Sequence, residues 1–250
     1  MPFAVFDIET RIDKRLLNQV FFAGDNLGDQ QAYEKFGEQL TKGSGRGFFP
    51  TSLHVPISIA VGNVTDDYVL RSVESLAAAD YSEPNLVRDF WARTERFPGC
   101  LVSFNGRRFD LPVLELQALR YGISAPTYFA EPGSARSRYS GTRHLDLMDF
   151  ITNYGAFQIR GGMDLLLKMI GMPGKIGMDG SQVQEAFEAG RIAEIHRYCR
   201  SDVIQTYFLF IRVELMRGRI DETRYRAAHA ESAHFLAELE SREPPTSGAN

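Results

Sequence analysis

Two acidic side chains lie close together near the start of the chain, in the segment Phe-Ala-Val-Phe-Asp-Ile-Glu-Thr at residues 3–10. Successive side chains of a strand point to opposite faces, so a strand here places Asp7 and Glu9 on one face and Phe6 and Ile8 on the other. Neighbouring carboxylates repel each other, and burial raises the cost of their charge. A divalent cation with oxygen ligands relieves that cost. Taken alone, the triplet favours a plainer interpretation, a strand that runs out into solvent, because such triplets often arise by chance.

A second group of polar residues, Asn-Gly-Arg-Arg-Phe-Asp at 105–110, directly follows the apolar run 101–104. Asp110 therefore falls near the end of a strand or the start of the next helix, at the sheet edge where ligands gather in open α/β folds. Two structural roles compete with a functional one. Asp110 alone is typical of a helix N-cap, and Asn105 with Gly106 is typical of a turn.

A third group, Tyr-Cys-Arg-Ser-Asp at 198–202, lies inside a long predicted helix. Tyr198 and Asp202 are four residues apart and share one helix face. Aspartate has a poor helix propensity, so its place among apolar residues has a cost that a metal would offset. The competing interpretation is a partly exposed Asp202 paired with a nearby arginine such as Arg200.

The elements that must position these groups alternate between strands and helices. Strands are predicted at 3–10, 53–64, 67–75 and 100–104, with 53–64 and 67–75 joined as an antiparallel hairpin. Helices are predicted at 85–96, 111–121, 146–154, 164–171 with Asp164 as N-cap, 181–189, 191–217 and 221–241. Residues 11–50 are polar and punctuated by glycine, with a short helix at 30–40. This order predicts an α/β fold with a mixed central sheet flanked by helices.

The composition agrees with one main domain. Of 250 residues, 44% are hydrophobic and 24% are charged, which is typical of a globular protein. We expect the domain to span 1–217, followed by a helical extension at 218–242 and a disordered tail at 243–250. No apolar run is long enough to cross a bilayer, and no signal segment precedes the first strand. Two cysteines, with no metal-ligand spacing, favour the reducing cytoplasm. A net charge of −4 excludes a strongly basic nucleic-acid binder.

In this order and spacing, the three groups resemble the motifs of the DnaQ-like exonucleases, which have the ribonuclease H-like fold and form the DEDD superfamily. The tyrosine form resembles the DEDDy branch, and within it the predicted 3′–5′ exonucleases related to the exonuclease domain of family B DNA polymerases. The resemblance spans roughly residues 3–212. It includes the segment His-Leu-Asp-Leu-Met-Asp at 144–149 and the turn Gly-Lys-Ile-Gly at 174–177.

The resemblance implies that Asp7, Glu9, Asp110 and Asp202 hold two divalent cations, with Asp7 touching both, and that Tyr198 orients the attacking water. The related DEDDh branch has a histidine five residues before the last aspartate. Arg197 occupies that position here, and His196 is one residue off, so we expect His196 to be an ordinary helix residue. Oxygen ligands select Mg²⁺ or Mn²⁺ over zinc.

Several other residues have both a structural and a functional interpretation. We expect Asp146 to cap the helix after it in preference to supporting the metals together with His144. The polar loop carrying Arg136, Arg138 and Arg143 is typical of a solvated loop, but these arginines, with Asn105, are candidates for substrate contacts.

Two adjacent aromatic residues precede the second predicted strand. Phe48 and Phe49 are expected in the core, although an exposed aromatic side chain there would be able to stack on a terminal base.

The sequence thus predicts a metal-dependent 3′–5′ exonuclease that hydrolyses single-stranded nucleic acid from a free 3′ end by a two-metal mechanism. Two alternatives remain open. One is a catalytically silent nucleic-acid-binding module on the same fold, and the other is a phosphohydrolase of small nucleotides. DNA and RNA are not distinguished by the sequence.

Overall fold

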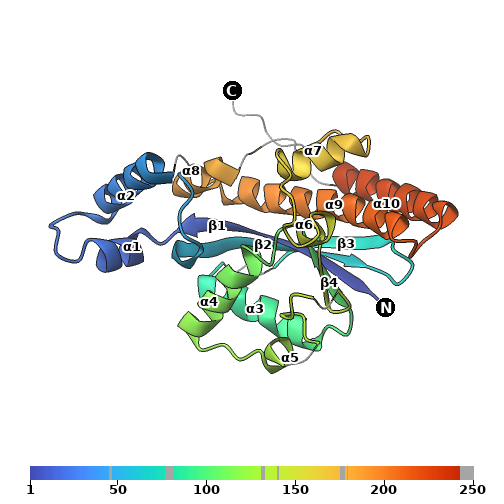
Figure 1. The fold of residues 1–250 in the computed structure, drawn as a ribbon, viewed down its shortest axis with the longest axis horizontal. Coiled ribbons are helices and arrows are strands. Elements are labelled where there is room, and N and C mark those ends of the chain that lie inside the picture. Colours follow the sequence, from blue (N-terminus) through green and yellow to red (C-terminus); the bar gives the residue numbers. More distant parts are fainter. Residues whose placement is uncertain are drawn as a thin grey trace.

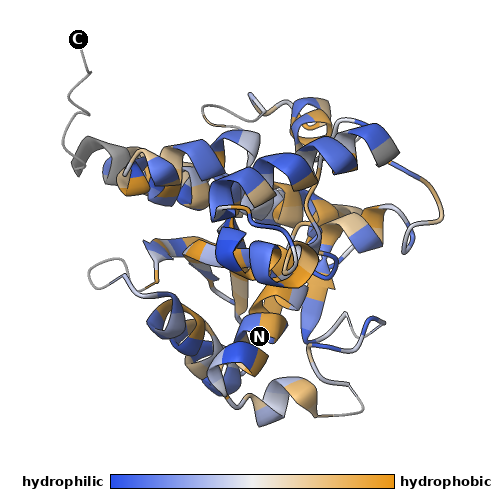
Figure 2. Cartoon of the chain, turned by 90° about the vertical axis from the view of Figure 1, so that its left-hand side faces the viewer, coloured by the Kyte–Doolittle hydropathy of each residue, from blue (hydrophilic) through white to orange (hydrophobic). Residues whose placement is uncertain are grey.

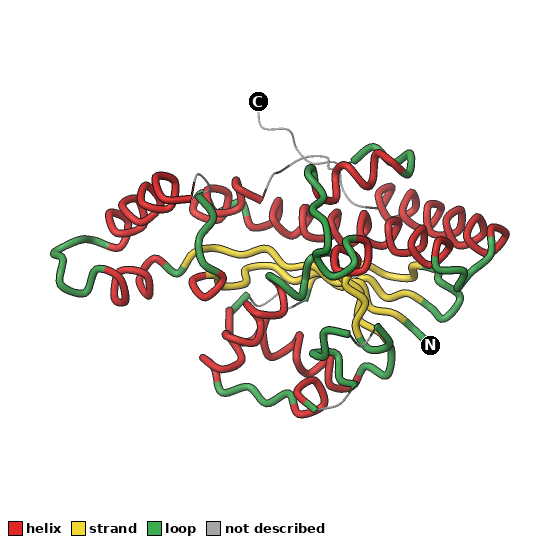
Figure 3. The backbone as a smooth tube through the Cα atoms, in the orientation of Figure 1, coloured by secondary structure: helices red, strands yellow, loops and turns green. Residues whose placement is uncertain are grey.

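The computed structural model describes residues 1–44, 47–76, 81–130, 133–139, 141–174, 178 and 180–242. A mixed five-stranded sheet lies between two layers of helices (Figures 1 and 3). The sheet order is β3-β2-β1-β4-β5, with β1 antiparallel to β2, β2 antiparallel to β3, and β1, β4 and β5 parallel. The strands are β1 Phe3–Ile12, β2 His54–Val64, β3 Leu70–Ser75, β4 Cys100–Ser103 and β5 His144–Asp146.

The helices fall into two groups on the faces of the sheet and one pair beyond its end. They are α1 Lys14–Phe21, α2 Asp29–Ser44, α3 Glu83–Arg96, α4 Asp110–Tyr121, α5 Pro126–Phe129, α6 Leu147–Ile151, α7 Gly162–Met169, α8 Val183–Glu188, α9 Ile192–Met216 and α10 Glu222–Arg242. Helices α9 and α10 cover one face, α3 and α4 cover the other, and α1 and α2 project past the sheet (Figure 1). Hydrophobic residues concentrate on the strands and on the helix faces turned toward them (Figure 2).

The central strand β1 separates the two halves of the core. Val5 packs in the cluster that contains residues of α9, whereas Phe6 and Ile8 pack in the cluster that contains residues of α3 and α4. Because side chains alternate along a strand, Asp7 and Glu9 lie on the α9 side with Val5. The predicted distribution of the β1 side chains is therefore confirmed.

The pairing of β1 with β2 shifts next to the acidic residues. Glu9 faces Ser58, but Thr10 faces Pro56, so Ile57 is an extra residue on β2. Such a bulge re-aims side chains locally. Pro56 is tolerated there because β3 pairs only with residues further along β2, beginning at Ala60, so β2 is an edge strand at that point.

The long helix α9 is buried along most of its length and carries the last motif. Its residues Val203, Tyr207 and Phe210 are all fully buried in the core. The hydroxyl of Tyr207 lies 2.6 Å from Ser232 Oγ, which joins α9 to α10. This packing fixes α9 across β1 and β2.

The structure corrects several of the predicted elements. The predicted helix 146–154 is shorter, at 147–151, and is preceded by the unpredicted strand β5, whose three residues are too few to give a pattern. The stretch 11–50 contains two helices in addition to the end of β1, where only a helix at 30–40 was expected. Asp164 is not the N-cap of α7, because Gly161 occupies that position.

Two of the expectations are not decided by these elements. The predicted tail 243–250 lies outside the described residues, and the division at residue 217 stays a prediction. Among the described residues, no helix is both long enough and apolar enough to cross a membrane.

We expect Gly62→Ala to lower the melting temperature. A Cβ atom at this β2 position would lie 2.9 Å from Val203 Cγ1 and 3.1 Å from Leu70 Cδ1, so α9 would have to move away from the sheet. Overpacking of this kind costs about 1–3 kcal/mol, which is a loss of a few degrees for a chain of this size. Gly24→Ala is the matched control because nothing lies within 4 Å of its added Cβ. Equal melting temperatures for the two variants in a thermal scan would contradict the close packing.

Candidate active site

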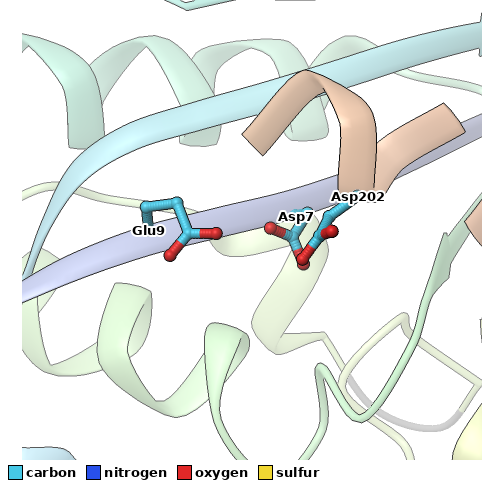
Figure 4. Close-up of side chains that lie close together, drawn as sticks. All are labelled: Asp7, Glu9 and Asp202. Atoms are coloured by element: carbon cyan, nitrogen blue, oxygen red, sulfur yellow. The ribbon is translucent and has the colours of Figure 1, made fainter. Parts of the chain in front are cut away.

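Three carboxylates converge where α9 crosses β1. Asp7, Glu9 and Asp202 each offer an oxygen atom, and these oxygens all lie within 4.8 Å of one another. Figure 4 shows the two β1 side chains directed to the same side as Asp202, which comes from the helix above them. Glu9 and Asp202 are buried, with exposed fractions of 8% and 4%. The structure thus brings together acids from the first and last motifs.

Asp110, from the second motif, lines the same cavity as these three acids. It is the first residue of α4, and Phe109 is the N-cap, so the simple capping role does not apply. Its Oδ1 accepts a hydrogen bond of 3.1 Å from the backbone N–H of Ile8, which lies between the two β1 acids in the sequence. Burial, with the charges of Asp146 and Asp202, raises the pKa of Asp110 to about 7.

The acids line a cavity of about 270 Å³. Asp110 lines it together with the three converging acids, although it lies outside their 4.8 Å group. Tyr198 lines it one helical turn from Asp202. The tyrosine ring also packs against Ile57 and Ile195. All five predicted catalytic positions therefore face one cavity, whose rim includes Asn105.

Asp146 holds the loop that leads to Asp110. Its Oδ1 accepts from the N–H groups of Asn105 (3.0 Å), Met148 (2.9 Å) and Asp149 (3.2 Å), and its Oδ2 accepts from the N–H of Arg107 (2.8 Å). The predicted cap of α6 is confirmed. The same carboxylate also fixes Asn105, which has a left-handed φ of 67°. Asp146 thus joins α6 to the motif that contains Asp110.

The neighbouring His144 is fully buried under this loop. Its Nε2 lies 2.8 Å from Ser103 Oγ, and burial together with the charge of Arg107 lowers its pKa. Ser103 ends β4, and a Cβ atom on Gly106 would lie 2.4 Å from its hydroxyl. His144 therefore supports the backbone of the loop and does not line the cavity.

A thiol lies directly behind Asp7. Cys199 Sγ donates to the backbone oxygen of Asp7 at 3.3 Å and lies 3.8 Å from its Oδ2. Burial and the charge of Asp7 raise the pKa of Cys199, which keeps it a neutral donor. The adjacent His196 bonds through Nδ1 to Ser58 Oγ at 2.8 Å. Neither supporting contact was predicted, because both join α9 to strands that are far away in the sequence.

The three loop arginines lie in different places. Arg136 donates to Glu115 at 3.2 Å and Arg138 donates to the Tyr154 oxygen at 3.1 Å, both beside the loop 105–110. Arg143 donates to the Pro98 oxygen at 3.1 Å, near the start of β5. None of the three lines the acidic cavity.

An aromatic cavity of about 630 Å³ adjoins the acidic one and shares Glu9 and Phe109 with it. Phe48 is 64% exposed, so the expectation that it lies in the core was wrong, whereas Phe49 packs against the cluster beneath α1 and α2. The Phe48 ring stacks on His54 with centroids 5.4 Å apart. Burial lowers the pKa of His54 and favours its neutral form. Two aromatic residues in a polar stretch were the only sequence signal for this surface.

The donor set of the acidic cavity fits hard divalent cations. The converging groups are carboxylates, with no nitrogen ligand among the described residues of the cluster. Several negative charges in one partly buried place repel one another. Burial, followed by the charges of Asp146 and Asp202, raises the pKa of Asp110 beside them. Cations bound by oxygen would offset that repulsion.

The family model of predicted 3′–5′ exonucleases related to the exonuclease domain of PolB matches residues 46–246. The chain belongs to this family. The match includes Asp110, Tyr198 and Asp202, and β1 with its two acids precedes it. No curated protein matches the chain.

Solved structures of similar fold include the family B DNA polymerase of the hyperthermophilic archaeon Pyrobaculum calidifontis. The TM-score is 0.55 and the identity 18%, over 86% of this chain and 24% of the polymerase. This likeness confirms the expected ribonuclease H-like α/β fold. Escherichia coli exonuclease I in complex with an oligonucleotide is more distant, with a TM-score of 0.36 and 16% identity over 88% of this chain and 45% of that one. The chain thus spans about a quarter of the polymerase.

We expect Asp110→Asn to stabilise the metal-free protein at pH 8 and to leave its stability at low pH nearly unchanged. The unfolded chain releases this proton near the ordinary pKa of 3.8, whereas the folded protein keeps it to about 7. The free energy of unfolding of the native protein therefore falls as pH rises between these two values. Asparagine does not ionise, so the variant does not lose this stability. Asparagine Oδ1 still accepts from Ile8. Melting temperatures in chelator should separate by at least a few degrees at pH 8.

The exposed Asp66→Asn is the matched control for this pH series. It removes one carboxylate of the same kind from an exposed position. The control should have the melting temperature of the native protein at every pH. If Asp110→Asn did so too, the folded protein would not raise the pKa of Asp110, and the prediction would be wrong.

Proposed function

We propose that this chain is a 3′–5′ exonuclease that removes nucleotides from the 3′ end of single-stranded nucleic acid, with Asp7, Glu9, Asp110 and Asp202 as ligands of two divalent cations. The observation that carries the proposal is the convergence of three carboxylates within 4.8 Å on a cavity that Asp110 and Tyr198 also line. Oxygen donors favour Mg²⁺ or Mn²⁺. Such cations, when bound, activate water and stabilise the leaving oxyanion of a phosphodiester.

The residues of the chain have separate roles in this proposal. The carboxylates of β1 and α9 form the acidic floor of the cavity, and Asp110 lines it from α4. Ring packing fixes the position of Tyr198, and in this proposal its hydroxyl orients the attacking water. Cys199 and Asp146 position other residues of the site. Cys199 bonds to the backbone oxygen of Asp7, and Asp146 bonds to the backbone N–H of Asn105.

The aromatic cavity supports a single-stranded substrate. Phe48, His54 and Phe109 present ring faces and edges next to Glu9. Bases stack on such side chains only when they are not paired in a duplex. We assign this cavity to the terminal base, and we assign Asn105, Arg136 and Arg138 to contacts with the substrate backbone. Arg143 is bonded to Pro98, so a contact between Arg143 and the substrate requires a nucleic-acid strand that reaches the start of β5.

The partner in this proposal is nucleic acid with a free 3′ end. Cys100 and Cys199 are free and buried thiols, which suits the reducing cytoplasm as the compartment. The cytoplasmic location, like the substrate, is part of the proposal.

We expect 5′-labelled single-stranded DNA or RNA to shorten from the 3′ end in Mg²⁺ or Mn²⁺ and to remain intact in chelator. Asp7→Asn should abolish most turnover while its metal-free melting temperature stays equal or rises, because like-charge repulsion is relieved. Full activity in excess chelator would exclude the two-metal proposal. A mononucleotide that is hydrolysed in preference to every oligonucleotide would instead support a nucleotide phosphohydrolase, and binding without hydrolysis would support a silent module.

We expect Tyr198→Phe to slow single-turnover hydrolysis by roughly 10²-fold while oligonucleotide binding changes little, because a misplaced water acts on the chemical step. Phenylalanine keeps the ring that packs against Ile57 and Ile195. The paired control is Tyr207→Phe, which removes a hydroxyl from the same helix at its contact with Ser232. That variant should lower stability without a comparable loss of rate. A native rate for Tyr198→Phe would remove the hydroxyl from the mechanism.

A further inference from the structure

Two further hollows continue from the acidic cavity along the surface. The first, of about 560 Å³, shares Asn105 and Met148 with the acidic cavity. The second, of about 220 Å³, shares Arg108 with the first and contains Arg136 and Arg138. Asn105 and Arg108 therefore connect the catalytic acids to a group of arginines.

The first hollow has the opposite charge to the acidic cavity. Its lining includes Arg108 and Arg160 and contains no carboxylate among the described residues. Both arginines are exposed, and neither side chain forms a hydrogen bond or ion pair with the part of the chain that the structure describes. The Arg108 guanidinium rests on Gly155, where an added Cβ atom would lie 2.9 Å from Nη2. We call this hollow the Arg108 groove.

The neighbouring arginines already have protein partners. Arg107 donates to the backbone oxygens of Ser137 at 3.1 Å and His144 at 2.7 Å, so it ties the loop to β5. Arg136 pairs with Glu115, and Arg138 lies 3.7 Å from Asp149. A ligand that needs positive charge would therefore meet Arg108 and Arg160 first.

The aromatic cavity and the Arg108 groove open from opposite sides of the catalytic acids. The aromatic cavity includes Thr10 and His54 on the β1–β2 side of the sheet, whereas Met148 and Thr152 follow β5 at the other edge. A single nucleic-acid strand that passes over the acids would have one end in the aromatic cavity and the other in the Arg108 groove. The aromatic cavity offers ring faces to a base, and the groove offers cations to phosphates.

We propose that the Arg108 groove binds the phosphodiester backbone of the nucleotides upstream of the scissile bond, with Arg108 and Arg160 as the phosphate contacts. This inference rests on the proposed exonuclease function and adds the path of the substrate. The 3′-terminal nucleotide lies on the aromatic side, and the remaining strand leaves over Asn105 toward Arg108. Guanidinium groups bind phosphate oxygens in a bidentate way, and a groove with positive charge follows a single strand without reading its sequence.

The test is the binding of a labelled single-stranded octanucleotide in chelator at a series of salt concentrations. Each phosphate contact contributes about 0.7 to the slope of log K against log salt for a single strand. We expect Arg108→Gln to reduce that slope by about 0.7 and to weaken binding roughly tenfold. The double variant with Arg160→Gln should lose about twice as much slope. Arg226→Gln, an exposed arginine on α10 paired with Glu222, is the matched control and should bind as the native protein does.

Hydrolysis of a dinucleotide separates a backbone contact from a role in chemistry. A dinucleotide has no phosphate upstream of the scissile one, so Arg108→Gln should cleave it at the native rate and should lose kcat/KM only on the octanucleotide. An unchanged salt slope, or an equal loss on both substrates, would overturn the proposal. Inorganic phosphate is the third probe, because a variant that loses phosphate affinity as strongly as octanucleotide affinity would mark a site for free anions instead.

The two proposals fail in different ways. If no oligonucleotide is hydrolysed but Arg108→Gln still lowers the salt slope, the groove stands and the nuclease function falls. If hydrolysis depends on metal and on Asp7 while the salt slope of Arg108→Gln is native, the nuclease stands and the groove falls. Melting temperatures equal to that of the native protein should accompany both arginine variants, since their side chains are exposed.

Discussion

Like charges held close together beneath α9 are the constraint on which the rest of this molecule depends. Asp7 and Glu9 face Asp202 because β1 alternates its side chains and α9 packs directly on the sheet. The helix approaches closely because β2 has a glycine, Gly62, at the contact with Val203. The buried apolar residues on either side supply the stability that offsets the repulsion. Burial first, and then the charges of Asp146 and Asp202, raise the pKa of Asp110, a fourth carboxyl group beside this cluster.

The local parts of the site follow from short-range geometry and were predictable for that reason. A period of two placed Asp7 and Glu9 on one face of β1, and a spacing of four placed Tyr198 and Asp202 on one face of α9. The family resemblance then predicted that these two pairs of residues belong to one site. The shape of the loop 105–110 was less accessible, because it depends on one distant carboxylate, Asp146, that accepts from four backbone N–H groups. No pattern within the loop shows where those donors go.

The surfaces around the site were the least predictable part. Three arginines within eight residues appeared equivalent in the sequence. In the structure, Arg143 directly precedes β5 and bonds to Pro98, whereas Arg136 bonds to Glu115 of α4 and Arg138 to Tyr154, just after α6. Phe48 follows a glycine-rich stretch, and its ring lies against His54 and Phe109, which are distant from each other in the sequence. Long-range packing decides such positions, and neither residue type nor local spacing encodes it.

The separation in sequence between the two sides of the site determines when it can first exist. The contact between Asp7 and Cys199 joins residues 192 positions apart. Chains are synthesised from the N-terminus at roughly 5–20 residues per second. The strand β1 is therefore made well before the helix that completes the acidic cluster. During the synthesis of the 192 residues that separate Asp7 from Cys199, a nascent chain carries both β1 acids without Asp202, so the acidic cluster cannot yet assemble.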